Sequence, residues 1–131
     1  MTEVWHLPSK LTTVFAVGTF CKRGSLEQKK RFLPPLAAGH HLGSWCLSEP
    51  DSGTNAAAMN TRAVLDGDTW ILNGTKRFVT NGDRAGIYVV LAVTDHSSPV
   101  GGGKNAVSTF IVERGTVGLT VSPRVTKWGV S

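Results

Sequence analysis

The chain has 131 residues, a formal net charge of +5 and a sequence pI near 9.6, with 40% hydrophobic and 18% charged residues. This length fits one domain and excludes two full-sized domains, and the composition excludes an intrinsically disordered chain. No apolar run is long enough to span a bilayer, so we expect no membrane span.

The first clear element is a helix that begins at Ser25, because Ser25 and Gln28 have the spacing of a capping box. Pro34 and Pro35 predict that this helix ends near Leu33, since proline lacks a backbone donor and disfavours helical geometry in the residue before it. The preceding residues, 1–24, show no pattern that separates helix from strand.

From Leu42 onward the pattern is typical of short strands, and the 15 glycines favour tight turns between them. Asp66-Gly67-Asp68 predicts one turn, and Asn73-Gly74 predicts a hairpin, since Asn-Gly is a strong hairpin signal. Residues 94–105 predict a loop. We expect strands at 44–48, 60–65, 70–72, 75–80, 87–93, 107–112 and 117–121, with a partial strand at 126–131. The fold class is therefore mainly β, with an antiparallel barrel-like or sandwich-like middle domain preceded by a short helical segment.

The basic residues are scattered, and no nucleic-acid-reading motif accompanies them, so we expect no nucleic-acid partner. Their charge suits phosphorylated small ligands, and equally a solvated surface. Cys21 and Cys46 lack the spacing of a disulfide framework or a zinc site, which predicts free buried thiols. His40 and His41 are adjacent and do not share a strand face, so we expect no metal site.

Two segments are candidates for ligand contact. Residues 48–55 (SEPDSGTN) combine small hydroxyls, a glycine and a proline after a strand, and such a loop can aim backbone N–H groups at a phosphate. Phe78 and Thr80 share one face of the expected strand, so they offer a flat aromatic surface and a hydroxyl donor. Taken singly, each segment is also typical of an ordinary turn or an exposed edge strand.

Taken together, these segments resemble the acyl-CoA dehydrogenase family. Residues 45–55 (WCLSEPDSGTN) are similar to the family pattern aromatic-x-x-[TS]-E-P-x-x-G-S-D. Residues 72–82 (LNGTKRFVTNG) are similar to L-N-G-x-K-x-[WF]-[IV]-T-N-G, and residues 28–39 to Q-K-x-x-x-L-P-x-L-x-x-G. Residues 108–112 and 127–129 match two later strand motifs, so the resemblance covers about residues 20–131.

The resemblance implies two domains: residues 1–38 end a helical domain and linker, and residues 39–131 form a C-terminally truncated middle β-domain. It implies that FAD is the cofactor and that particular residues contact FAD: Trp45, Leu47, Ser48, Gly53, Thr54, Phe78, Val79 and Thr80. Ser48 and Thr54 would also contact the acyl-CoA substrate.

Some positions depart from the family pattern. Thr54-Asn55 replaces Ser-Asp, so the charge of that aspartate is lost, whereas Ser48 and Phe78 keep a hydroxyl and an aromatic ring. The family uses the position of Glu49 structurally, and we expect no catalytic role for Glu49. The resemblance implies that no catalytic residue lies in this chain, because the family's base comes from a C-terminal domain.

The implied activity is flavin-dependent α,β-dehydrogenation of an acyl-CoA thioester, with electron-transfer flavoprotein as acceptor. The isolated chain is expected to be inactive and the complete protein to be a homo-oligomer in the bacterial cytoplasm or mitochondrial matrix, not secreted. Three alternatives remain open: an acyl-CoA oxidase or flavin monooxygenase of the same superfamily, a non-catalytic acyl-CoA-binding or flavin-binding module, and an unrelated basic β-domain.

Overall fold

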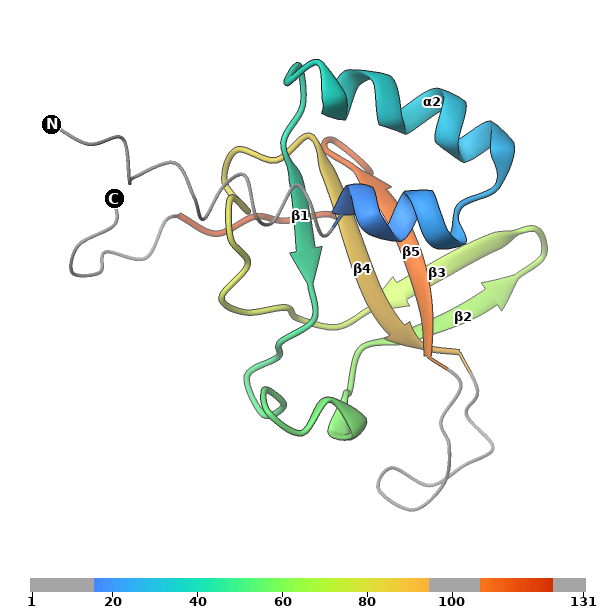
Figure 1. Ribbon diagram of the computed structural model, residues 1–131. Helices are drawn as coiled ribbons and strands as arrows, with labels where there is room; N and C mark the ends of the chain where they lie inside the picture. Colours follow the sequence, from blue (N-terminus) through green and yellow to red (C-terminus); the bar gives the residue numbers. More distant parts are fainter. Residues whose placement is uncertain (1–15, 95–106, 124–131) are drawn as a thin grey trace, which may run out of the picture. The chain divides into compact units, whose positions relative to one another are not determined.

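The structure is a computed structural model that describes residues 16–94 and 107–123 (Figure 1). Residues 16–23 are helical, and helix α2 (Leu26–Ala37) follows them. The later elements are β1 (Gly43–Cys46), the 3-10 turn η2 (Ala56–Ala58), β2 (Arg62–Asp66), β3 (Thr69–Asn73), β4 (Ile87–Val93) and β5 (Val107–Glu113). Across the described residues, no helix is long and apolar enough to cross a membrane.

The five strands form one mixed sheet in the order β1-β4-β2-β3, and β5 also pairs with β4. Strands β2 and β3 are antiparallel, with Asp66 opposite Thr69, whereas β2 and β4 pair in parallel through Arg62 and Val93. The prediction of a mainly β fold is confirmed. The expected antiparallel barrel is corrected: the parallel pair makes the sheet mixed, and the described strands do not close into a barrel.

The chain folds as two compact units. Among the described residues, the helical unit contains 16–45, 80–88 and 112–123, and the hairpin unit contains 46–79, 89–94 and 107–111.

The capping box predicted at the start of α2 is present in the helical unit. Ser25 Oγ accepts a hydrogen bond from the Gln28 N–H at 3.2 Å, and Gln28 Oε1 accepts one from the Ser25 N–H at 2.9 Å. These two bonds satisfy backbone donors that the first turn of a helix leaves without an intrahelical partner.

The prediction that α2 ends near Leu33 is wrong, because the helix continues through both prolines to Ala37. Proline lacks a backbone N–H, but its carbonyl still accepts: the Ala38 N–H donates to the Pro34 carbonyl at 2.9 Å. The extra turn also buries Leu36, and burying a leucine stabilises by about 1.5–3 kcal/mol, similar to the cost of a helical proline.

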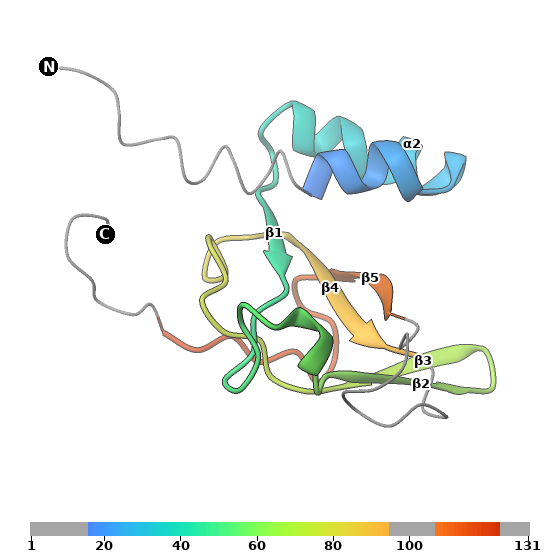
Figure 2. The same ribbon diagram turned by 60° about the horizontal axis from the view of Figure 1, so that its bottom comes forward.

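The core of the helical unit joins its two helical segments. Phe20 stacks on Phe32 with a centroid distance of 5.5 Å, and Figures 1 and 2 show residues 16–23 beside α2. The buried apolar residues of this unit are Ala16, Phe20, Phe32, Leu36, Ala85, Ile87 and Tyr88.

In the hairpin unit, β2 and β3 form a two-residue hairpin at Gly67-Asp68, which confirms the predicted turn (Figure 2). Gly67 has φ +58°, a conformation that glycine adopts without steric cost. The buried apolar residues of this unit are Cys46, Met59, Ala63, Val89, Ala92 and Val93.

The second predicted hairpin is wrong, because residues 74–80 form no strand and Asn73-Gly74 is not a hairpin turn. Gly74 serves a close approach instead: a Cβ at Gly74 would lie 2.4 Å from Thr61 Oγ1 and 2.7 Å from Thr61 Cα. The Asn-Gly pair therefore reflects packing of the chain against the residue that precedes β2.

Gly74→Ala is expected to lower the free energy of unfolding by about 1–3 kcal/mol, because the added methyl overpacks against Thr61. Denaturant titration measures the change. Gly18→Ala is the matched control, since nothing lies within 4 Å of a Cβ there and alanine favours the helix. Equal destabilisation by both variants would contradict the close-approach role of Gly74.

Toward the C-terminus, β4 is confirmed as a strand buried along most of its length, and β5 is also confirmed. The strand predicted at 117–121 is wrong. Gly115 and Gly118 have φ +89° and +87°, and the Leu119 N–H donates to the Thr116 carbonyl at 3.0 Å, so this segment turns. The partial strand at 126–131 and the loop beyond Thr94 lie outside the described residues.

Candidate functional site

The loop after β1 closes on itself in the hairpin unit. The Glu49 N–H donates to the Ser52 carbonyl at 2.7 Å, and the Ser52 N–H donates back to the Glu49 carbonyl at 3.3 Å. Ser52 Oγ donates to the Asn55 carbonyl at 2.7 Å. The N–H groups of Glu49 and Ser52 are thus used within the loop, so these two donors drop out of the predicted set of anion-binding N–H groups.

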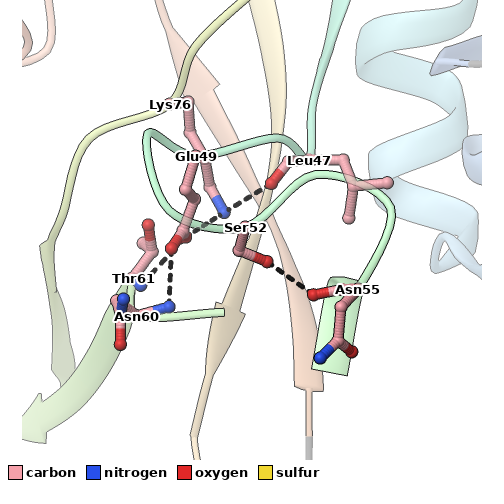
Figure 3. Close-up of polar contacts among 7 residues, drawn as sticks. All are labelled: Leu47, Glu49, Ser52, Asn55, Asn60, Thr61 and Lys76. Carbon is pink, nitrogen blue, oxygen red and sulfur yellow. Dashed lines mark hydrogen bonds and ion pairs between the residues drawn. The ribbon is translucent and has the colours of Figure 1, made fainter. Parts of the chain in front are cut away.

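Glu49 and Lys76 form a buried ion pair beneath this loop (Figure 3). Lys76 Nζ lies 2.8 Å from Glu49 Oε1, and the two side chains are 9% and 3% exposed. The N–H groups of Asn60 and Thr61 donate to the Glu49 carboxylate at 2.6 and 2.9 Å, and Lys76 Nζ also donates to the Leu47 carbonyl at 3.1 Å. The pair therefore ties the loop to the start of β2 and to the segment after β3.

These contacts determine the charge state of Glu49. Burial alone would raise the pKa of Glu49, but the hydrogen bonds from Lys76 and from the backbone N–H groups of Asn60 and Thr61 outweigh burial and lower the pKa to about 2. Glu49 is therefore ionised at neutral pH and a very weak base, in agreement with the predicted structural role.

The two sequence motifs meet in the hairpin unit through their backbones. The Arg77 N–H donates to the Ser48 carbonyl at 2.7 Å, next to the bond from Lys76 to the Leu47 carbonyl. Leu47, Ser48 and Val79 are half-buried. The structure thus brings Leu47 and Ser48 beside residues 76–77, one residue away from Phe78.

Phe78 does not lie on a strand, so the prediction that it shares a strand face with Thr80 is wrong. Phe78 has φ +56° and is 78% exposed, and the Arg77 guanidinium lies 5.0 Å from its ring centroid. A left-handed conformation is costly for an aromatic residue, and such strain is concentrated at functional sites. The Phe78 ring is still available as a flat surface. Its exposure comes with a left-handed backbone conformation, and not from a position on a strand face as predicted.

Trp45 and Thr80 lie in the helical unit, and both are half-buried. The buried Ser44 hydroxyl donates to the Thr80 carbonyl at 2.8 Å, so the backbone next to Trp45 is fixed to the segment that carries Thr80. Gly53 and Thr54 lie at the exposed part of the loop in the hairpin unit.

The remaining candidate residues are the two cysteines and the adjacent histidines. The prediction that both thiols are buried is wrong for Cys21, which is exposed, and right for Cys46. Burial raises the pKa of Cys46 to about 12, against the opposing effect of Lys76, so this thiol is unreactive. His40 and His41 are exposed, and the described residues contain no group of three or more potential metal ligands.

The sequence reasoning did not identify Lys76 as the partner of Glu49. The two residues are 27 positions apart, and a single lysine in a loop carries no periodic signal. The lysine of the L-N-G-x-K pattern is the one sequence signal that marks Lys76. The pattern does not show that this lysine pairs with Glu49, which becomes visible only in the folded structure.

Known proteins are similar to this chain over most of its length. The profile of the acyl-CoA dehydrogenase middle domain matches residues 44–131. A probable acyl-CoA dehydrogenase of Mycobacterium tuberculosis is 47% identical over 108 residues, which cover 82% of this chain and 27% of the relative.

Solved structures give the same result. Glutaryl-CoA dehydrogenase of Mycobacterium smegmatis in complex with FADH2 is 41% identical, with a TM-score of 0.77 over 86% of this chain and 27% of the other. A structure described as the electron transferring flavoprotein of Acidaminococcus fermentans is 47% identical, with a TM-score of 0.68 over 76% of this chain and 25% of the other.

The profile match identifies residues 44–131, which contain the mixed sheet and both loop segments, as a middle domain of the acyl-CoA dehydrogenase class. The chain belongs to the acyl-CoA dehydrogenase family. It spans about a quarter of the length of the relatives it matches.

Proposed function

We propose that this chain supplies the middle-domain part of the FAD and acyl-CoA site of an enzyme that dehydrogenates acyl-CoA thioesters at the α and β carbons. The family match over residues 44–131 is the observation that carries this proposal. The isolated chain is proposed to be inactive, and the base that removes the α-proton to lie elsewhere in the protein. Glu49 is a poor candidate for that base, because its carboxylate is paired with Lys76 and its pKa is lowered to about 2.

The residues present fit a flavin. The exposed Phe78 ring offers a flat surface, and half-buried Leu47, Ser48 and Val79 belong to the same unit. Trp45 and Thr80 of the helical unit are proposed as further contacts, with the Thr80 hydroxyl as a donor to the ring. The chemistry that bound FAD would supply at these residues is acceptance of the hydride from the β-carbon of the thioester.

On the substrate side, we propose that Ser48 and Thr54 contact the acyl-CoA and that Gly53 lets the backbone approach a phosphate group closely. The bond from the Arg77 N–H to the Ser48 carbonyl fixes the backbone of Ser48 beside the second motif segment, which supports this assignment. Electron-transfer flavoprotein is proposed as the acceptor, and the complete protein as a cytoplasmic homo-oligomer.

The purified complete protein tests the activity directly. Under anaerobic conditions, a panel of acyl-CoA thioesters of increasing chain length is added, and bleaching of the flavin absorbance is recorded. Bleaching by at least one thioester supports the proposal, and a flavin that no thioester reduces contradicts it. Rapid peroxide formation when the reduced protein meets oxygen would favour an oxidase over a dehydrogenase.

Phe78→Gly in the complete protein is expected to weaken FAD binding about twofold to twelvefold, because an aromatic contact is worth about 0.5–1.5 kcal/mol beyond area burial. The same change is expected to leave stability unchanged within about 1 kcal/mol, since glycine relieves the left-handed strain at φ +56°. Fluorescence titration with FAD and denaturant unfolding measure the two effects. Phe78→Tyr, which keeps the ring, is the control, and equal FAD affinity in both variants would contradict the assigned contact.

A further inference from the structure

The helical unit contains a cavity of about 690 Å³ whose residues all belong to that unit. This volume lies within the usual range of small-molecule sites. Its apolar lining residues with large side chains or rings are Phe32, Pro35, Leu42 and Ile87. The cavity is therefore large enough for an organic ligand, and it has a surface for an apolar part of that ligand.

The polar lining of the cavity is mainly cationic. Arg31, Arg84 and Arg114 line it together with the imidazoles of His40 and His41 and one carboxylate, that of Glu113. Three guanidinium groups and one carboxylate leave two net positive charges (3 − 1 = 2) on the lining side chains. Arginine forks match the geometry of phosphate and carboxylate oxygens, so the charge favours an anionic ligand.

Backbone carbonyls hold the Arg114 side chain in the cavity lining. Its Nε donates to the Ala85 carbonyl at 2.8 Å, and its terminal nitrogen donates to the Asp83 carbonyl. Both acceptors are neutral carbonyls, so these bonds fix the guanidinium without cancelling its charge. Arg84 contacts a carboxylate only weakly, with Nε 3.8 Å from Asp83 Oδ2.

Glu113 behaves as an internal competitor for an anion. Its Oε1 lies 2.5 Å from the terminal nitrogen of Arg31, and the two side chains are 50% and 64% exposed. An exposed pair of this kind contributes little to stability and exchanges readily with another anion. An incoming ligand can thus take the place of Glu113 on Arg31.

The end of helix α2 opposes anion binding only slightly. The partial negative charge of a helix C-terminus resides on its last carbonyls. Here the Pro34, Pro35 and Leu36 carbonyls accept from the N–H groups of Ala38, His41 and Gly39. Because these carbonyls are capped, the guanidinium groups dominate the field in the cavity.

We propose that this cavity binds a small organic phosphate monoester, with the phosphate on Arg31, Arg84 and Arg114 and the organic part against the apolar lining residues. A phosphate monoester carries a charge of about −1.5 to −2 at neutral pH, which balances the lining. A single carboxylate would bring about half that charge and still have to displace Glu113.

Calorimetric titration of the purified protein with phenyl phosphate tests the proposal, with inorganic phosphate and phenol as parallel probes. Phenyl phosphate is expected to bind most tightly, inorganic phosphate more weakly and phenol not measurably, and added salt should weaken binding. Absence of phenyl phosphate binding would overturn the proposal. Inorganic phosphate that binds as tightly as phenyl phosphate would overturn the assignment of an organic ligand.

Variants locate the site. Arg84→Ala is expected to weaken phenyl phosphate binding about threefold to tenfold, and Glu113→Gln to strengthen it by a similar factor, because the competing charge is removed. Arg23→Ala is the matched control, since Arg23 is exposed in the same unit and does not line the cavity. Weakening by Glu113→Gln, or equal weakening by the two arginine variants, would contradict the site. Thermal unfolding of each variant separates loss of binding from loss of fold.

Discussion

Lys76→Met is expected to lower the free energy of unfolding by about 3–5 kcal/mol, because breaking a buried ion pair leaves an uncompensated charge in the interior. The substitution removes the ammonium partner of Glu49 and leaves a carboxylate that is 3% exposed without its counter-ion. It also removes the bond from Lys76 Nζ to the Leu47 carbonyl. Denaturant unfolding of the wild type and the variant at the same neutral pH measures the difference.

The chain supplies a matched control in its exposed ion pair. Arg31→Met breaks the pair with Glu113, whose side chains are 64% and 50% exposed, and is expected to cost less than about 1 kcal/mol. The double variant Lys76→Met/Glu49→Gln is expected to recover part of the loss, because the buried charge is then gone. Similar losses in Lys76→Met and Arg31→Met would show that burial of the pair does not determine its contribution.

The second large effect is the acid dependence of stability that Glu49 contributes. The pKa of Glu49 is lowered from its ordinary 4.5 to about 2 in the folded state. A group with a depressed folded pKa stabilises the fold above its unfolded pKa and loses that contribution as pH falls through the folded value. Between pH 4.5 and 2, the folded protein should therefore lose about 3 kcal/mol on account of this one carboxylate.

Unfolding free energies measured over this acid range test the expectation. The wild type should lose more stability than Glu49→Gln, which is already destabilised at neutral pH but lacks the titrating group. A direct NMR titration of the Glu49 carboxyl should show no protonation near pH 4.5. Parallel pH profiles for the two proteins would contradict the assigned pKa.

Both predictions concern the residues that hold the loop of residues 47–55. The Glu49–Lys76 pair fixes the Leu47 carbonyl, and the adjoining backbone bond fixes the Ser48 carbonyl. Because Leu47 and Ser48 belong to the proposed flavin and substrate site, variants of the pair are expected to alter ligand affinity as well as stability.

Local signals in the sequence were reliable where neighbours in the chain decide the structure. The capping box of Ser25 and Gln28 forms, and the turn at Gly67-Asp68 joins β2 to β3. The apolar run of β4 predicts a strand covered on both faces, and β4 is buried along most of its length. In the capping box and the turn, the interacting groups lie within a few residues of one another. In β4, nearly the whole segment is apolar.

Local signals failed where a distant segment overrides them. Pro34 and Pro35 do not end α2, because the packing of Leu36 and the carbonyl bonds after Pro34 maintain the helix. Asn73-Gly74 does not form a hairpin turn, because Gly74 lies against Thr61, 13 positions earlier in the chain (74 − 61 = 13). An Asn-Gly pair that forms a hairpin turn and an Asn-Gly pair whose glycine packs against a distant segment have the same sequence.

The sequence by itself determined the family, the mainly β class and the two motif segments, because these follow from residue types and spacing along the chain. Only the tertiary structure decided that the sheet is mixed, that Phe78 is exposed in a left-handed conformation and that Lys76 is the partner of Glu49. The cationic cavity of the helical unit is likewise a tertiary feature, built from α2, the segment before β4 and the end of β5. All four features depend on which distant residues meet in the folded chain. Burial, charge pairing and backbone strain follow from those contacts, and residue spacing along the chain does not encode them.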